Sequence, residues 1–265
     1  MRYRVLSFVL ILASLSFVRL SANGQGLCWE SKMTGGPLGE RTSKYYYMPK
    51  KFKFAEDNGT EAFIFRLDKE LLVVLYPGDK TYSEITFAEL EKKMKELGGK
   101  MDKQLEDMRK QFAALPPDQR KVMEQMMGDK MRGLNSSGKF DVKRTGESKT
   151  IGGYACAKYS VRQDGKETVG LWTTKDVKDF ELIRKDLEQF GQRMAAMTPN
   201  TGKGLAEAMK NLEGFPIQTE FMGMTSTVSK IEKRNTPGSE FEVPAGYTKV
   251  APKMFQGMEG HEEEK

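Results

Sequence analysis

The feature that most constrains the fold is a change in the period of the apolar residues along the chain. Between Leu27 and Ile85, short runs alternate apolar and polar side chains, which is the period of strands with one buried face. From residue 87 onward, apolar residues recur at steps of three and four, which predicts one face of an amphipathic helix. This stripe consists of Phe87, Leu90, Met94, Leu97, Met101, Leu105, Met108, Phe112 and Leu115. The fold must therefore place long apolar helix faces against a sheet.

The same change of period occurs again further along the chain. Pro116-Pro117 ends the first helix and opens a second one, which carries Val122, Met123, Met126, Met127 and Met131. Strand patterns return at 139–174, helical spacing at 180–194 and 205–212, and strand patterns at 216–221, 225–234 and 241–243. The predicted order is six strands, a helical pair, three strands, a second helical pair, and two or three strands.

This order predicts an α+β fold. The strands are joined by short turns, which implies antiparallel neighbours, because parallel pairing needs a long crossover. Helices that arrive in pairs between such strand blocks are typical of α+β proteins. A single strongly curved sheet, with both helical pairs packed on its concave face, covers every apolar stripe at once. We expect one domain over 25–250, followed by a disordered acidic tail over 251–265.

The first 24 residues have the three parts of a cleavable signal peptide. Arg2 and Arg4 precede an apolar run from Val5 to Val18, and Ala22-Asn23-Gly24 supplies small residues before the expected cut at Gln25. The run is too short to span a bilayer, which takes roughly 20 apolar residues. The sequence therefore predicts a periplasmic or otherwise exported protein.

Charge and hydropathy exclude some classes of function. The leader holds three arginines and no acid, so its removal lowers the formal net charge from +6 to +3. This small excess does not indicate a nucleic-acid-binding protein, which usually presents a clustered basic face. No later apolar run approaches membrane length, so we expect a mature chain without a transmembrane span. We also expect the mature chain to be a monomer.

Two cysteines, Cys28 and Cys156, remain after the leader. An even count in an exported protein makes one disulfide a reasonable expectation. Alternation places Cys28 on one strand face with Glu30, and Cys156 on one face with Lys158. A bond requires that the two strands be neighbours. The alternative is two separate buried thiols.

The chain lacks the residues of the common catalytic sites. Its only histidine, His261, lies in the acidic tail, so neither a histidine-activated nucleophile nor a histidine-based zinc site is available. We expect no enzymatic activity and no cofactor.

The helical methionines have three interpretations. Thioethers bind copper(I), which makes Met123, Met126 and Met127 an alternative metal site. Methionine is also a deformable core residue, and its flexibility suits a surface that accepts varied apolar partners. The sequence leaves core packing, ligand lining and metal binding open.

Five segments in a fixed order resemble an exported bacterial family of unknown function. They are Gly26-Leu27-Cys28-Trp29-Glu30, Arg66-Leu67-Asp68-Lys69 through Thr81-Tyr82-Ser83-Glu84, Ile151-Gly152-Gly153-Tyr154-Ala155-Cys156, Leu171-Trp172, and Phe241-Glu242-Val243-Pro244-Ala245-Gly246-Tyr247. That family is similar to the periplasmic lipoprotein-carrier superfamily, which includes the LolA carrier and the RseB envelope sensor. The resemblance implies an open, incomplete β-barrel of about eleven strands, with the helices as a plug or lid over an apolar cavity.

The resemblance implies a non-enzymatic protein that binds a lipid or an acylated protein in this cavity. The alternatives are an interaction or envelope-sensor module whose cavity is filled by its own helices, and the methionine-based copper(I) binder. Tryptophans on strands are also compatible with plain core packing. The side chains expected to line the cavity or its lid are Trp29, Phe63, Phe65, Leu67, Met94, Met101, Met108, Phe112, Met123, Met126 and Met127.

Overall fold

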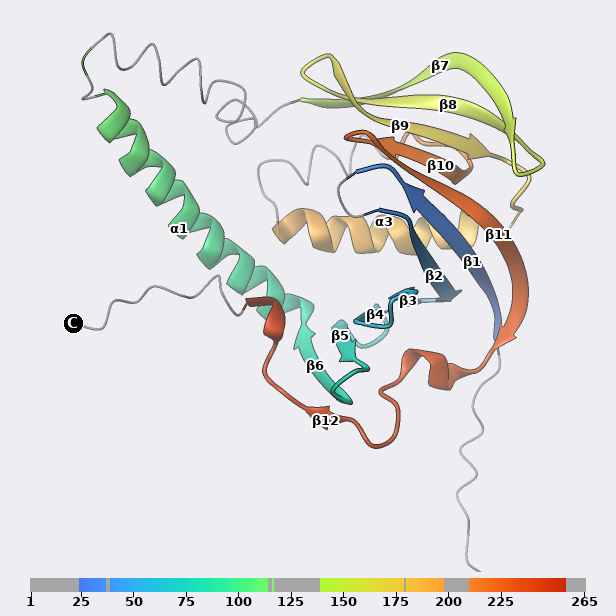
Figure 1. Cartoon of the computed structure of the whole chain (residues 1–265), viewed down its shortest axis with the longest axis horizontal. Coiled ribbons are helices and arrows are strands. Elements are labelled where there is room, and N and C mark those ends of the chain that lie inside the picture. The colour runs from blue at the N-terminus through green and yellow to red at the C-terminus, as the bar shows by residue number, and fades with distance from the viewer. Residues whose placement is uncertain are drawn as a thin grey trace, which may run out of the picture.

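A computed structural model describes residues 24–36, 39–113, 116, 139–178, 180–197 and 210–255. Within these residues the chain forms one sheet of twelve strands, in the order β12-β6-β5-β4-β3-β2-β1-β11-β10-β9-β8-β7 (Figure 1). The strands are β1 (Gly24–Thr34), β2 (Arg41–Met48), β3 (Lys51–Glu56), β4 (Ala62–Arg66), β5 (Leu71–Tyr76), β6 (Thr81–Thr86), β7 (Phe140–Ile151), β8 (Tyr154–Gln163), β9 (Lys166–Thr174), β10 (Phe215–Phe221), β11 (Met224–Thr236) and β12 (Thr248–Lys249).

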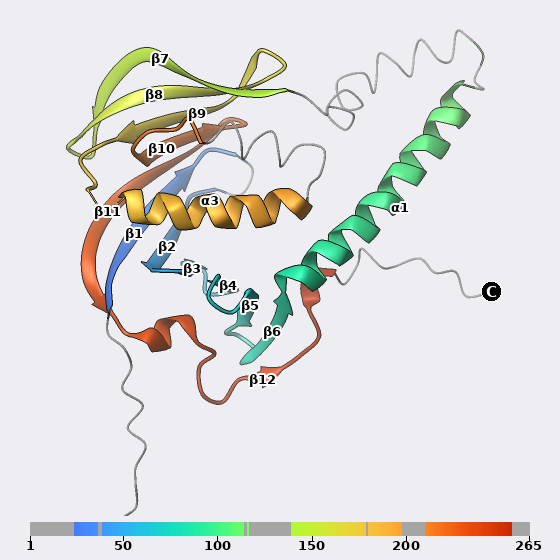
Figure 2. The ribbon, with the colours of Figure 1, turned by 180° about the vertical axis from the view of Figure 1, so that it is seen from behind.

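The sheet is bent and does not close on itself. Every neighbouring pair is antiparallel except β12 and β6, which are parallel. Two views from opposite sides show the strands wrapping around the helix α3 (Phe180–Met197), which lies in the hollow of the curve (Figures 1 and 2). We call the side that holds α3 the concave face and the opposite side the convex face.

The helix α1 (Phe87–Ala113) begins directly after β6. Its first turn is a capping box, because the Glu89 amide donates to Thr86 Oγ1 at 3.2 Å and the Thr86 amide donates to Glu89 Oε2 at 3.0 Å. Phe87 and Leu90 are buried against Leu72 and Ile85 of β5 and β6. The rest of α1 extends away from the sheet (Figures 1 and 2).

A buried carboxylate fixes α3 to the concave face. Tyr47 on β2 donates its hydroxyl to Asp186 Oδ2 at 3.0 Å, and the backbone amide of Lys50 donates to the same oxygen at 2.6 Å. Burial and the neighbouring Asp186 raise the pKa of Tyr47, so its hydroxyl keeps the donated proton at neutral pH. At the other end of the helix, Arg193 forms an ion pair with Glu70 in the β4–β5 turn.

The convex face of β3 to β6 is covered by the C-terminal segment. After β11, the 3-10 helix η1 (Gly238–Phe241) inserts Phe241, which is 1% exposed, among Met48, Ile64, Val73 and Leu75. Val243 and Tyr247 extend this cover, and β12 then pairs with the outer edge of β6. The strand β4 is therefore buried most deeply at Ala62, Ile64 and Arg66, which point to the convex side.

Arg66 links this C-terminal segment to the sheet. Its guanidinium donates to both carboxylate oxygens of Asp68 at 2.8 and 2.7 Å, to the Phe241 carbonyl at 3.1 Å and to Glu242 at 2.5 Å. Arg66 is 4% exposed. Hydrogen bonding to Arg66 lowers the pKa of Asp68, which keeps that carboxylate charged.

The structure confirms a curved antiparallel sheet and corrects several details. The described residues hold twelve strands rather than about eleven, because the two-residue strand β12 was missed. The predicted strand 241–243 is wrong: Phe241 ends the 3-10 helix η1, and the Glu242 amide bonds Ser239 instead of a neighbouring strand. Proline at 237 and 244 removes the backbone donors that a strand there would need.

Other predictions are met only in part by the described residues. One long helix of each predicted pair is present, and the expected second helices, at 117–131 and 205–212, lie almost wholly outside the described residues. In the predicted tail, η2 (Lys253–Phe255) buries Phe255, 4% exposed, in the cluster that holds the start of α1. Packed structure therefore extends to residue 255, and residues 256–265 and most of the leader lie outside the description.

We predict that Arg66→Ala lowers the free energy of unfolding by about 3 kcal/mol, because the substitution leaves the Phe241 carbonyl and two carboxylates without their shared donor. Urea unfolding measures the change. The matched control is Lys69→Ala, which removes a lysine 52% exposed and 3.6 Å from the same Glu242. Its cost is expected below about 0.5 kcal/mol, as for surface ion pairs. Equal losses for the two variants would contradict the assigned role of Arg66.

A second prediction concerns the attachment of α3. Asp186→Ala leaves the buried Tyr47 hydroxyl and the partly buried Lys50 amide without their acceptor, so we expect a loss of about 2 kcal/mol in unfolding free energy. The control is Glu188→Ala on the same helix, whose carboxylate pairs with Arg184 at 3.4 Å and is 38% exposed. A small effect of Asp186→Ala, similar to that of Glu188→Ala, would show that packing alone holds the helix.

Candidate functional site

A row of aromatic rings crosses the concave face. Trp29 on β1 stacks on Tyr45 on β2 with ring centroids 5.0 Å apart, Tyr45 meets Phe54 on β3 at 5.1 Å, and Phe54 meets Phe63 on β4 at 6.0 Å. Each contact joins directly opposed residues on neighbouring strands. We call Trp29, Tyr45, Phe54 and Phe63 the aromatic row. All four side chains are half-buried.

The helix α3 covers the parallel row next to it. Leu27, Tyr47, Phe52 and Phe65 are paired in turn across β1 to β4. On the helix side, Ile183 is buried in the same cluster as Leu27 and Tyr47. Phe190 meets Phe65 edge-on at 4.6 Å. The aromatic row therefore lies along one flank of α3 instead of beneath it.

Both ends of the aromatic row adjoin buried clusters. At one end Trp29 meets the edge of Phe215 at 5.5 Å, and Phe215 meets Phe180, the first residue of α3, at 5.7 Å. At the other end Phe63 packs against the cluster of β5, β6 and α1, together with Phe65 and Leu67. Met94 and Leu97 of α1 border the same cluster and are also partly buried. The row therefore connects the cluster that holds Phe180 and Phe215 with the cluster of β5, β6 and α1.

The predicted cavity residues fall into two groups. Trp29, Phe63, Phe65, Leu67 and Met94 all lie on or beside the concave face. The side chains of Met101, Met108 and Phe112 are outside the description, although the backbone of α1 is described there, and Met123, Met126 and Met127 lie wholly outside it. The copper(I) alternative therefore stays a hypothesis. Whether any of these residues binds a ligand also stays a prediction.

The residues predicted to line the cavity did not include four that take part in these ring contacts: Tyr45, Phe54, Phe190 and Phe215. Tyr45 and Phe54 were visible in the pattern, because strand alternation places Tyr45 with Tyr47 and Phe54 with Phe52. The contacts of Phe190 and Phe215 depend on where α3 crosses the sheet, which strand periodicity does not determine.

Of the two alternatives for the cysteines, the structure has two separate buried thiols and no disulfide. Cys28 and Cys156 are both free and buried, and their strands β1 and β8 are separated in the sheet by β11, β10 and β9. Neighbouring strands lie about 4.8 Å apart, whereas a disulfide needs Cα atoms within about 7 Å. Cys28 Sγ lies 3.7 Å from Thr236 Oγ1, and Cys156 Sγ donates to the Tyr154 carbonyl at 3.4 Å. Burial raises the pKa of both thiols, which disfavours thiolate chemistry.

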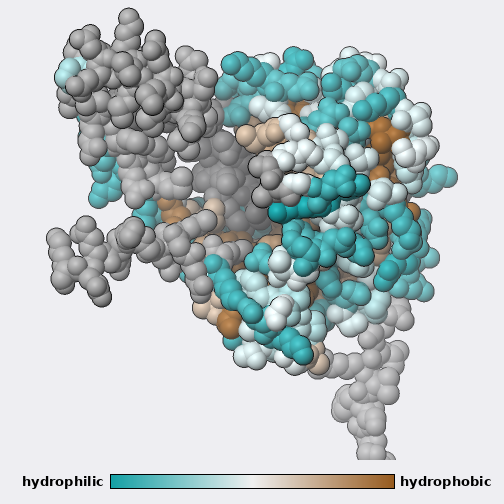
Figure 3. Space-filling model, viewed as in Figure 1, coloured by the Kyte–Doolittle hydropathy of each residue, from teal (hydrophilic) through white to brown (hydrophobic). Residues whose placement is uncertain are grey.

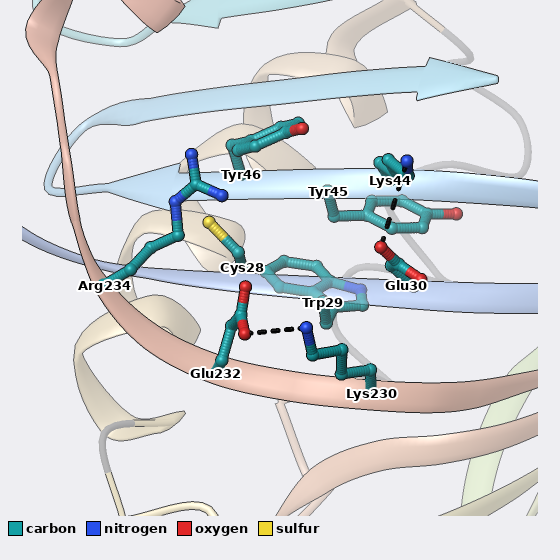
Figure 4. A pocket seen from close by; sticks show the side chains of 9 residues that line it. All are labelled: Cys28, Trp29, Glu30, Lys44, Tyr45, Tyr46, Lys230, Glu232 and Arg234. Atoms are coloured by element: carbon teal, nitrogen blue, oxygen red, sulfur yellow. Dashed lines mark ion pairs between the residues drawn. The ribbon is translucent and has the colours of Figure 1, made fainter. Parts of the chain in front are cut away.

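Cys28 lies instead in a small pocket on the convex face (Figure 4). Charged residues surround it, including the ion pair of Lys230 with Glu232 at 2.9 Å. Its volume is about 30 Å³, which holds about one water molecule. This pocket is too small for an organic ligand.

A larger pocket of about 480 Å³ lies at the N-terminal end of α3. Ion pairs line it, between Lys175 and Glu213 at 2.5 Å and between Arg184 and Glu181 at 2.7 Å. Its paired charges suit neither an apolar ligand nor a strong anion. The aromatic row is therefore the better candidate for binding an apolar group.

The described residues show neither a metal-binding cluster nor a membrane-spanning helix. None of them forms a cluster of three or more His, Cys, Asp or Glu side chains placed to hold a metal ion. In the same part of the chain, neither α1 nor α3 combines the length and the apolar character that a membrane span needs.

Several solved structures are similar to this chain at low sequence identity. An uncharacterised conserved protein from Thermus thermophilus is 9% identical, with 85% of this chain and 90% of that chain covered and a TM-score of 0.43. PNGF-II is 9% identical over 89% of this chain, with a TM-score of 0.39. MucB, solved in the Pseudomonas aeruginosa MucA/MucB complex, is 8% identical over 84% of this chain, with a TM-score of 0.37.

The chain spans only 32% of PNGF-II and 57% of the MucA/MucB chain that it matches. No curated protein matches the sequence. The sequence does match, over residues 88–247, a family described as a domain of unknown function, DUF4412. This match spans more than half of the chain and confirms the expected relation to a family of unknown function, so the protein is a member of the DUF4412 family.

Proposed function

We propose that this protein is a non-enzymatic binding protein that holds an apolar chain, from a lipid or a lipidated protein, along the aromatic row of its concave face. The observation that carries the proposal is the unequal cover of the two faces. On the convex side, Phe241 and its neighbours cover the apolar residues of β4 and β5, whereas four large rings on the concave side remain half-buried. Large aromatic surfaces usually become buried, so a partly exposed row favours a binding role.

The geometry of the row suits an extended hydrocarbon. Its three ring-to-ring steps of 5.0, 5.1 and 6.0 Å form a continuous apolar strip across four strands. Apolar area removed from water contributes about 25 cal/mol per Å² before the costs of ordering. The outer surface offers no comparable strip in the view of Figure 3, where hydrophilic residues dominate the described surface and apolar ones form small patches.

Export is part of the same proposal. We infer that residues 1–24 form a leader that is removed on export, because they have the basic start, the apolar run and the small-residue end of a cleavable signal peptide. Expression in a bacterium with the native N-terminus, followed by mass spectrometry of the intact protein, should give a mature chain that starts at Gln25. A full-length chain that begins at Met1 and stays with the membrane fraction would contradict this prediction.

The binding prediction is tested with a fluorescent fatty acid. We expect saturable binding to the wild-type protein, and Tyr45→Ala should weaken it about tenfold, which corresponds to about 1.4 kcal/mol, because it interrupts the apolar strip. Tyr46→Ala is the matched control, since Tyr46 is the next residue on the same strand and points to the convex face, where it packs against the C-terminal cover. Its affinity should stay within about twofold of the wild type.

Absence of saturable binding to the wild type would refute the proposal. Equal losses for Tyr45→Ala and Tyr46→Ala would show that the two variants act through stability and not through contact with the ligand. Thermal unfolding of both variants separates these outcomes.

A second candidate is an interaction or sensor module whose own helix fills the concave face. The contact of Phe190 with Phe65 favours it, because α3 already occupies much of the apolar width of the sheet. Pull-down from envelope extracts distinguishes the two functions. A partner that the Tyr45→Ala variant retains supports the surface module, whereas a partner lost with the fatty-acid probe supports the binding row.

A further inference from the structure

The outer edge of β7 is the longest free strand edge in the described part of the chain. β7 (Phe140–Ile151) ends the sheet order and pairs only with β8 among the described strands. Most of its residues, from Lys143 to Thr150, are exposed. The opposite end of the sheet differs, because β12 covers the edge of β6. A free edge presents backbone donors and acceptors that another strand can bind.

Four charged residues of β7 share one face of this strand. Asp141, Lys143 and Lys149 stand opposite Arg162, Ser160 and Cys156 of β8. These partners are separated by even numbers of residues and therefore point to one side. Glu147 joins them, because its carboxylate lies 3.4 Å from the ammonium of Lys158 on the same side of β8.

The charges alternate in sign along the strand, as minus, plus, minus and plus. The irregular segment between Arg144 and Ser148 leaves this order intact, because it inserts two residues and so keeps the parity of the strand.

This pattern is self-complementary about Thr145. An antiparallel second copy of β7, with Thr145 opposite Thr145, places Asp141 opposite Lys149 and Lys143 opposite Glu147, and the two-fold symmetry repeats both pairs. A shift by two residues places Asp141 opposite Glu147 in one direction and Lys143 opposite Lys149 in the other. Like charges directly opposed are destabilising, so the charges select a single register.

We propose that β7 is a dimer interface at which a second copy of this chain continues the sheet in this register. The inference goes beyond the proposed ligand function and replaces the monomer expected from the sequence. Lys143 and Glu147 are 63% and 55% exposed, and their ion pairs within the chain are 3.4 Å long, so both side chains are able to exchange partners. The two-fold axis of such a pair is perpendicular to the sheet, so the two concave faces open to the same side.

Charge reversal tests the register by sedimentation equilibrium. The wild type should dimerise, with weaker association at high salt. Lys143→Glu and Glu147→Lys each oppose like charges twice, so each should weaken the dimer at least about tenfold. The double variant restores both pairs and should dimerise again. A mixture of the two single variants should form a heterodimer. Lys103→Glu, exposed on α1, is the charge-matched control and should dimerise like the wild type.

A wild type that remains monomeric at every accessible concentration would overturn the proposal, even if the edge of β7 bound a different protein. Dimerisation that neither single variant weakens, or that the double variant fails to restore, would also overturn it. Thr145→Cys gives an independent measurement, since opposed residues have Cβ atoms about 4.5–5.5 Å apart and cross-link with small adjustment. Oxidation should yield a covalent dimer, and a non-covalent dimer that fails to cross-link would refute this register.

Discussion

The strands β4 and β5 carry apolar side chains on both faces, and the remaining architecture follows from the need to cover both. β5 illustrates the constraint, because five of its six residues, Leu72 to Tyr76, are buried. Strands buried on both sides read as continuous apolar runs, as in sheets that lie between two layers. Here the layers come from distant parts of the chain. The start of α1 covers Leu72 and Val74, and the C-terminal segment covers Val73 and Leu75.

On the concave side, α3 covers one row of apolar residues and leaves the next row half-buried. A carboxylate with two donors, Tyr47 and Lys50, determines where α3 crosses, and this position leaves the aromatic row beside the helix. Polar anchoring and apolar exposure are thus linked. The proposed binding role depends on this attachment as much as on the rings themselves.

Periodicity predicted most of the sheet, because local alternation sets which residues form a strand and which face each occupies. It identified the six N-terminal strands, the start of the first helix near Phe87 and the placement of Phe63 and Phe65 on one face. It failed where contacts join distant segments. The pairing of Cys28 with Cys156 needed the strand order, which placed three strands between them. Phe241 was mistaken for a strand residue, because Phe241, Glu242 and Val243 alternate apolar and polar side chains as a strand does, although Phe241 ends a 3-10 helix.

The resemblance to a known family was carried by residues whose roles only the structure explains. Arg66 and Asp68 of one segment and Phe241 and Glu242 of another meet in a single polar cluster. Their order along the chain therefore reflects one tertiary contact, not two local motifs. For the site, strand alternation identified Trp29 and Phe63. It did not predict the chain of ring contacts that links them through Tyr45 and Phe54, because the alternation within one strand does not show which strands are neighbours.

Because the C-terminal segment covers β4 and β5 on the convex face, these strands become fully buried only when the C-terminal segment is present. Arg66 and its partners Phe241 and Glu242 are 175 and 176 positions apart, so the N-terminal strands keep an apolar surface open until nearly the whole chain has emerged. Such distant contacts delay folding, which suits the proposed export of an unfolded chain. They also mean that truncation anywhere before Phe241 leaves Ile64 and Val73 without their cover, which favours proteolysis and aggregation of the incomplete chain.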